Sequence, residues 1–114
     1  MTSTVIVRMK TCDKTHRVVA KLRDDGDVDI RITSDCEKAR QFGERCTRVS
    51  LDDVTDFYGS RVNSKEIRGN LWIQCLLPIG VFDAAWMELG MLSKSLCKKV
   101  GGDEIVLDRC DSEE

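Results

Sequence analysis

Two runs of alternating apolar and polar residues flank a short acidic turn, and this feature restricts the fold most. The runs span residues 18–23 and 28–33, and residues 24–27 between them read Asp-Asp-Gly-Asp. Gly26 can adopt the positive φ that a tight turn needs. Because alternation places the apolar side chains of a strand on one face, the sequence predicts an antiparallel hairpin with one buried face. The residues expected on that face are Val18, Ala20, Leu22, Ile30 and Ile32.

Two further segments are expected to extend this sheet. Val5, Val7 and Met9 alternate with polar neighbours near the start of the chain and predict a third strand. Residues 104–108, Glu-Ile-Val-Leu-Asp, could form a last strand at the edge of the sheet. The sheet should therefore have three strands, or four if the last segment joins it.

The first two helices are predicted from their starting residues. Ser34 and Glu37 have the spacing of a capping box, which predicts a helix from this point to about Arg45. Ser50 and Asp53 repeat the pattern and predict a shorter helix that ends at Gly59. Residues 60–70 are polar and are expected to form a flexible loop, whereas residues 71–73, Leu-Trp-Ile, are expected to be buried.

Pro78 marks the start of the principal core helix, because proline suits the first helical position. Apolar residues follow at helical spacing, and Gly101-Gly102 should end the helical region. Together these patterns predict one α+β domain over residues 1–108, with an antiparallel sheet packed against two or three helices, and a frayed acidic tail over residues 109–114. The helical residues expected to face the hairpin are Phe42, Val81, Phe82, Ala85 and Leu89.

Charge and hydropathy exclude several classes of partner. The 114 residues include 18 Lys and Arg against 20 Asp and Glu. Nucleic-acid and anionic-membrane binders normally carry a basic surplus, so neither is expected here. No apolar run approaches the length of a signal peptide's core or of a membrane span. The sequence favours a cytoplasmic protein, in which cysteines stay reduced.

The six cysteines are the only unusual feature of the composition. No Cys-x-x-Cys pair is present, so neither a zinc ribbon nor a thioredoxin-type motif can form. Cys12 precedes the hairpin, and Cys36 and Cys75 lie at two predicted helix starts. A helix N-terminus favours the thiolate, which is the form that binds metals or acts as a nucleophile. If both helices point at the loop of Cys12, three soft ligands converge.

The order of these elements resembles the U-type iron–sulfur cluster scaffold proteins (IscU and the N-terminal domain of NifU). The matching segments are Thr11-Cys12-Asp13, Asp35-Cys36-Glu37 and Gln74-Cys75, within a likeness over residues 5–92. The segment Ser50-Leu51-Asp52-Asp53 also resembles the part of these scaffolds that follows their first helix. The TSCPD domain associated with ribonucleotide reductases has a related layout. The resemblance implies an IscU-like fold and binding of a soft metal by the three cysteines.

A nearer resemblance is to a family of small uncharacterised proteins from methanogenic archaea. Ser34-Asp35-Cys36 and Cys75-Leu76-Leu77-Pro78 match two of that family's cysteine patterns. Gln74 stands where the U-type scaffolds place a histidine ligand, so a fourth ligand must come from elsewhere. Asp13 is suggested by the Cys-Asp pair, and His16 is the only histidine. Cys46 is too far along the predicted helix from Cys36 for both to bind one metal.

The main hypothesis is that Cys12, Cys36 and Cys75 bind zinc or an iron–sulfur cluster, with Asp13 or His16 as a fourth ligand. One alternative is a non-catalytic interaction module, with a protein partner or a homodimer and with cysteines that only fill the core. A second alternative is a thiol redox protein. The sequence favours a non-enzymatic role, because a lone histidine cannot supply a hydrolase triad. Cys97 and Cys110 receive no role.

Overall fold

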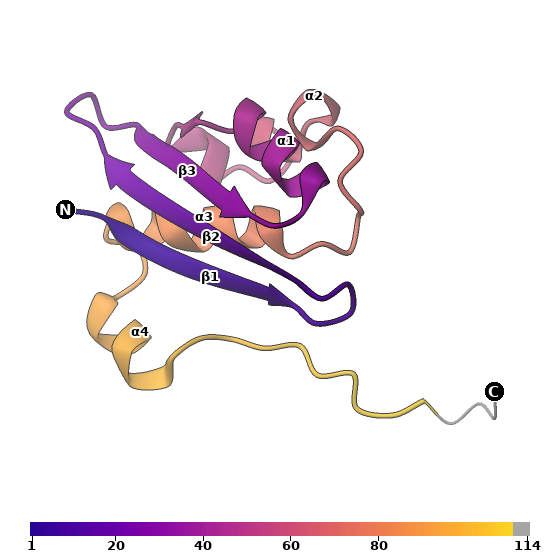
Figure 1. The fold of residues 1–114 in the computed structure, drawn as a ribbon. Coiled ribbons are helices and arrows are strands. Elements are labelled where there is room, and N and C mark those ends of the chain that lie inside the picture. The colour runs from indigo at the N-terminus through magenta and orange to yellow at the C-terminus, as the bar shows by residue number, and fades with distance from the viewer. Residues whose placement is uncertain (111–114) are drawn as a thin grey trace.

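The computed structural model describes residues 1–110, and it confirms a single α+β domain (Figure 1). Four antiparallel strands form one sheet in the order in which they follow one another along the chain. The strands are β1 (Ser3–Met9), β2 (Lys14–Leu22), β3 (Val28–Ser34) and the short β4 (Arg48–Val49). The fourth strand is thus β4, and it is not the predicted segment near the C-terminus.

The predicted hairpin is formed by β2 and β3. Val18 pairs with Ile32 and Ala20 with Ile30, and Gly26 adopts a φ of 93° in the turn. Val18, Ala20 and Ile30 are buried, as the alternation predicts. The prediction that Leu22 is buried is wrong, because this residue is 44% exposed. It is the last residue of β2, where the strand passes the end of the long helix and donates its N–H to Glu88 at 3.1 Å.

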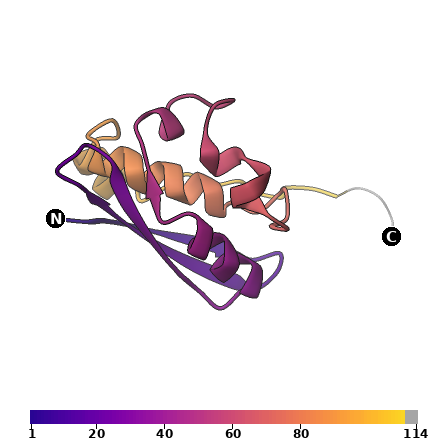
Figure 2. The same ribbon diagram turned by 90° about the horizontal axis from the view of Figure 1, so that it is seen from above.

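Helices α1 (Glu37–Arg45) and α3 (Leu77–Glu88) cover the inner face of the sheet. Figure 2 shows α3 from above, lying along the strands. Phe42 of α1 and Val81 and Ala85 of α3 are fully buried in one core with the hairpin, whereas Phe82 and Leu89 pack against it partly buried. These contacts confirm the predicted helix faces.

The predicted capping box at the start of α1 is wrong. Cys36 is the N-cap residue, with no side-chain cap. Ser34 Oγ instead accepts the N–H of Cys36 at 2.9 Å, and Glu37 pairs with Arg40 one turn along the helix. Ser34 is the last residue of β3 and lies two residues before the N-cap, so it does not cap the helix.

Two residues fix α3 to the sheet. A Cβ added to Gly80 would lie 2.5 Å from Cγ2 of Val7, so only glycine permits this close approach of α3 to β1. Glu88, at the other end of α3, accepts hydrogen bonds from Ser3 Oγ at 2.7 Å and from the Leu22 N–H. Pro78 lies in the first turn of α3, as predicted. The helix is therefore fixed at both ends.

The connection between β4 and α3 differs from the prediction. Ser50 and Asp53 do cap each other, at 2.9 and 3.2 Å, but the helix is only the 3₁₀ turn η1 (Asp52–Val54) and does not reach Gly59. Residues 60–70 are not a flexible loop, because they contain η2 (Arg61–Asn63) and α2 (Lys65–Arg68). Val62 is 1% exposed and joins the core. Ile67 also packs against the core, so two apolar side chains fix a segment whose composition is otherwise polar.

Asp53 holds this connection together. Its carboxylate accepts the backbone N–H groups of Ser50 and Arg61, and the Arg61 guanidinium donates to it at 2.6 Å. Burial alone would raise the pKa of Asp53, but the hydrogen bonds from Arg61 and Ser50 lower it to about 2. The ionised carboxylate thus joins η1 to η2.

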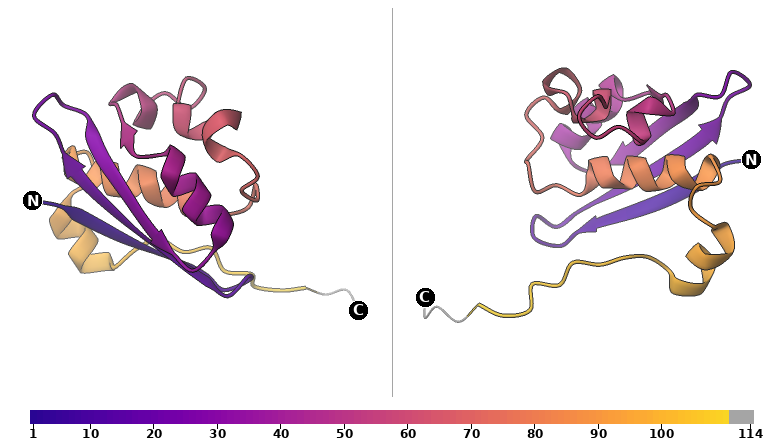
Figure 3. Two further views of the ribbon diagram at one scale, coloured as in Figure 1. Left: turned by 45° about the horizontal axis from the view of Figure 1, so that its top comes forward. Right: turned by 180° about the vertical axis from the view of Figure 1, so that it is seen from behind.

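The chain continues beyond α3 into α4 (Lys94–Val100), which ends at Gly101 in the left-handed conformation, as predicted. The predicted strand over residues 104–108 is wrong, because residues 101–110 adopt no regular structure and remain exposed (Figure 3). Of the expected frayed tail, residues 109–110 are exposed and irregular, and residues 111–114 lie outside the described part. Among residues 1–110 no helix has the length and apolar character needed to span a bilayer.

Candidate functional site

A cavity of about 260 Å³ lies where the β1–β2 turn meets the N-terminal ends of α1 and α3. Cys12 comes from the turn, Cys36 from the N-cap of α1, and Cys75 from the residues just before α3. His16 reaches the same cavity from β2. The three cysteines predicted from the sequence therefore line one cavity, together with the only histidine. We call it the cysteine cavity.

Two of its candidate ligands, His16 and Cys75, are in contact. Nε2 of His16 lies 3.8 Å from Sγ of Cys75. Nδ1 of the same ring lies 2.7 Å from Ser34 Oγ, so Ser34 sets the ring orientation and Nε2 is left to face the cysteine. The imidazole is 1% exposed. Sequence reasoning missed Ser34, whose position beside Cys36 suggested a helix cap instead.

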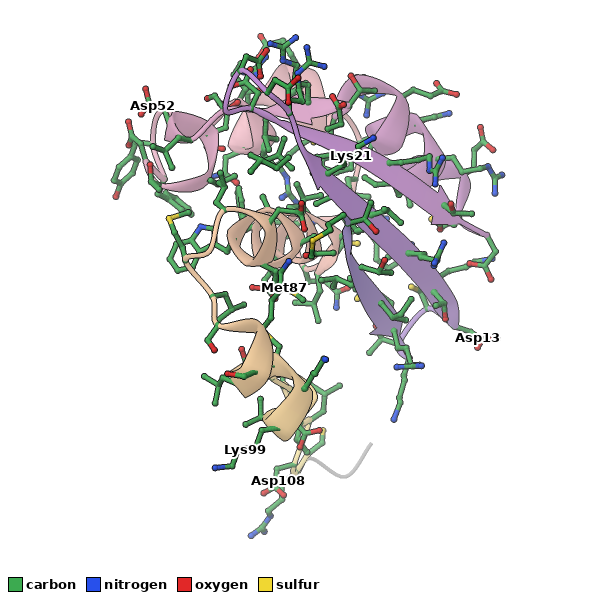
Figure 4. All side chains as sticks on the ribbon, turned by 90° about the vertical axis from the view of Figure 1, so that its left-hand side faces the viewer. Asp13, Lys21, Asp52, Met87, Lys99 and Asp108 are labelled. Carbon is green, nitrogen blue, oxygen red and sulfur yellow. The ribbon has the colours of Figure 1, made fainter. Side chains whose placement is uncertain are left out.

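Cys12 and its neighbour Asp13 point in different directions. Cys12 is half-buried, and its Sγ lies 3.7 Å from the carbonyl oxygen of Met9. Asp13 has a positive φ of 58°, is exposed, and does not line the cavity. Figure 4 shows it at the tip of the β1–β2 turn. Of the two proposed fourth ligands, the structure brings only His16 to the cysteines.

Burial disfavours the charged forms of Cys75 and His16. Burial raises the pKa of the Cys75 thiol, a hydrogen bond from the Leu77 N–H acts against this, and charge on Cys12 and Cys36 raises the pKa further. Burial also lowers the pKa of His16, although Asp35 acts in the opposite sense. At Cys75 the N–H of Leu77 at the start of α3 favours the thiolate, as predicted, but burial outweighs it.

An aromatic side chain borders the opening of the cavity. Trp72 lines it with 57% of its surface exposed, and Nζ of Lys38 lies 5.8 Å from its ring centroid. The expectation that residues 71–73 are all buried is wrong, because Leu71 alone is buried and Ile73 is 93% exposed. The Trp72 carbonyl accepts hydrogen bonds from the Cys75 N–H and from Arg68, which fixes the backbone before α3.

The remaining cysteines lie away from the cavity. Cys46 is 2% exposed in the core, and burial, together with the charge of Asp53, raises the pKa of its thiol to about 12. Cys97 lies on α4, and Cys110 is exposed in the irregular segment that follows. Cys46 is thus a core residue, and Cys97 and Cys110 can serve as internal controls.

The donor set of the cavity can be compared with the needs of a metal. Two ligands bound to a tetrahedral zinc at about 2.3 Å (sulfur) and about 2.0 Å (nitrogen) lie about 3.5 Å apart. The separation of 3.8 Å between His16 and Cys75 is close to this value. Within residues 1–110, however, no three His, Cys, Asp or Glu side chains are gathered as a ready-made metal site. The other two cysteines would have to move closer to complete one.

The fold and the cavity define a small α+β protein with a thiol-lined pocket. Residues 3–100 match the family described as "Family of unknown function (DUF6951)", and the chain belongs to that family. Searches of curated proteins and of solved structures return no match. The likenesses to the iron–sulfur scaffolds, to TSCPD domains and to the archaeal family therefore stay predictions.

Proposed function

We propose that this protein binds a soft metal, as zinc or as an iron–sulfur cluster, in the cysteine cavity. The observation that carries the proposal is that Cys12, Cys36, Cys75 and His16 come from four separate segments and line one cavity. Thiolate and imidazole are the ligands that zinc and iron–sulfur clusters use in proteins. Magnesium and calcium prefer oxygen ligands and fit this cavity poorly.

His16 is the preferred fourth ligand. Ligating histidines usually bond one ring nitrogen to the protein while the other binds the metal. Nδ1 of His16 is hydrogen-bonded to Ser34 Oγ, and Nε2 faces Cys75, as this role requires. Gln74 also lines the cavity, at the position where the scaffold proteins have a histidine. In this proposal His16 supplies from β2 the imidazole that position 74 lacks.

A cation in the cavity would offset the negative charge of coordinating thiolates. Without one, the thiol of Cys75 holds its proton because its surroundings are apolar and because charge on Cys12 and Cys36 would repel its own. A bound metal supplies positive charge and deprotonates coordinating thiols. The raised pKa of Cys75 weakens a redox role for this cysteine, since reactive cysteines need a low pKa. A cytoplasmic location, which keeps thiols reduced, belongs to the proposal.

The experiment is anaerobic expression and purification, followed by metal and sulfide analysis and an absorption spectrum. One equivalent of zinc would indicate a structural or regulatory site, and iron with sulfide would indicate a cluster. Separate Cys12→Ser, Cys36→Ser and Cys75→Ser variants should each lose most of the metal. Cys97→Ser and Cys110→Ser are matched controls that should keep it.

Two results would contradict the proposal. One is a protein that stays metal-free after anaerobic reconstitution with zinc or with iron and sulfide. The other is metal that is retained equally by the cavity variants and by the controls. Either result, with folding unchanged, would favour the interaction module, in which Cys12, Cys36 and Cys75 serve only packing.

A further inference from the structure

The last described segment of the chain packs little against the rest of the protein. Residues 91–110, which we call the C-terminal arm, include α4 and contain no buried residue. Three adjacent apolar residues, Ile105, Val106 and Leu107, are 72%, 66% and 78% exposed. Yet α4 is well capped, since Ser93 Oγ accepts the N–H of Leu96. A helix of seven residues is marginal alone in water, so contact with a further surface would stabilise the arm.

Strand β1 offers an unpaired edge. Within residues 1–110, β1 pairs with β2 on one side and has no strand on the other. Such an edge presents free backbone N–H and C=O groups that can accept a further strand. On the open face of the sheet, β1 places the exposed residues Thr4, Ile6 and Arg8. On the inner face, it places Val5 and Val7 beside the core.

Residues 104–108 have the pattern of a strand that fits this edge. Alternation would place Glu104, Val106 and Asp108 on one face and Ile105 and Leu107 on the other. Beside β1, Val106 would then contact Ile6, and one of the two flanking carboxylates would lie next to Arg8. Neighbouring strands are stabilised by such apolar pairs and by pairs of opposite charge. The other face would add two aliphatic side chains next to Val5 and Val7.

We propose that residues 104–108 of one copy pair with the free edge of β1 of a second copy, so that two copies exchange arms. In the single chain, the arm passes on the side of the sheet where β1 lies but forms no strand with it (Figures 1 and 3). Burial raises the pKa of Asp83 on α3, and the negative charge of Asp103 in the arm raises it further. The arm therefore lies near a like charge on its own chain. Reciprocal exchange between two copies closes the assembly, as symmetric dimers do.

The mass in solution tests this exchange. The wild-type protein, kept in reductant so that Cys97 and Cys110 cannot cross-link, should have twice the 12.9 kDa mass of the chain by light scattering. The variant carrying both Ile105→Asp and Leu107→Asp should be monomeric. These side chains are exposed in the single chain, so their replacement should leave its folding unchanged. Leu51→Asp, at another exposed apolar site, is the matched control and should stay dimeric.

Reversing the charge of Arg8 tests whether the arm pairs with the edge of β1. Arg8→Glu should weaken the dimer, and a mixture of Arg8→Glu with a chain carrying Glu104→Lys or Asp108→Lys should restore association. Restoration by Asp108→Lys would indicate a parallel arrangement, and restoration by Glu104→Lys an antiparallel one. Hydrogen exchange should show protection of residues 104–108 in the dimer and its loss in the monomeric variant.

Four outcomes would overturn the proposal. The wild type could be monomeric at concentrations well above micromolar, or its dimer could be unaffected by the arm substitutions. The dimer could disappear in reductant, which would identify it as a disulfide product. Residues 104–108 could be protected in a monomer, which would mean that each arm pairs with its own β1. None of these depends on whether the cysteine cavity holds a metal.

Discussion

Nε2 of His16 lies 3.8 Å from Sγ of Cys75, although the two residues are 59 positions apart in the chain. The contact exists because β2 and the N-terminal end of α3 meet at one end of the sheet. Leu76 fixes this junction through its N–H, which lies 3.5 Å from the sulfur of Met9. A buried imidazole beside a half-buried thiol is therefore part of the packing of α3 on the sheet.

Ser34→Ala should weaken metal binding without unfolding the protein. The substitution removes the 2.7 Å contact with His16 Nδ1 and the acceptor for the Cys36 N–H. Loss of an outer partner of a ligating histidine typically lowers metal affinity about 10–100-fold. Competition with a chromophoric chelator would measure the change. Thr33→Ala is the control, since Thr33 is exposed on the open face of the sheet. Equal affinity in both variants would remove Ser34 from the site.

Asp53→Asn should lower the free energy of unfolding by about 1–3 kcal/mol at neutral pH, the usual range for a lost hydrogen bond to a charged group. The pKa of Asp53 is about 2 in the folded protein, below its ordinary value of 3.8. A depressed pKa contributes stability above the ordinary value, and this contribution is lost as the pH falls through about 2.

Urea unfolding of Asp53→Asn and of the wild type across this acidic range measures the effect. The difference between the two proteins should be constant near neutral pH and should shrink as the pH falls. Asp52→Asn is the control, because Asp52 is an exposed neighbour and should change stability by less than about 0.5 kcal/mol. A difference that does not vary with pH would show that the Asp53 carboxylate contributes packing and no charge.

Gly80→Ala should destabilise the protein by about 1–3 kcal/mol, the usual cost of overpacking. Its Cβ would meet Cγ2 of Val7 at 2.5 Å, and α3 would have to move away from β1. Val7→Ala should relieve part of this clash, so the double variant should lose less stability than the two single losses summed. Glu44→Ala, exposed in α1, controls for a change of helix propensity. Strict additivity would contradict the close approach.

The sequence predicted those parts of the fold that depend on local patterns. The alternation around Gly26 identified the β2–β3 hairpin, and Pro78 identified the start of α3, because turn chemistry and periodicity act within a few residues. Residues 104–108 also have a strand pattern, but a strand forms only where a neighbour pairs with it, and within residues 1–110 no strand does so. Val62 fixes η2 through tertiary burial, which the polar composition around it conceals.

The candidate site was predicted through its cysteines and not through its supporting residues. Cys36 and Cys75 could be placed at helix starts, which act as local landmarks. The choice between Asp13 and His16 could not be made from spacing, since both lie close to Cys12 in the chain. It depends on the β1–β2 turn, where the positive φ of Asp13 accompanies its placement outside the cavity. Ser34 on β3 bonds to His16 on β2, and no local sequence pattern reveals a contact between strands.

X-ray absorption spectroscopy of the zinc-loaded protein tests the central claim most directly. The account predicts a four-coordinate zinc with three sulfur ligands at about 2.3 Å and one imidazole nitrogen at about 2.0 Å. His16→Ala should remove the imidazole signal, and Cys75→Ser should reduce the sulfur count by one. A shell of oxygen and nitrogen alone, or a spectrum that these two substitutions leave unchanged, would contradict the assignment of the cysteine cavity as a metal site.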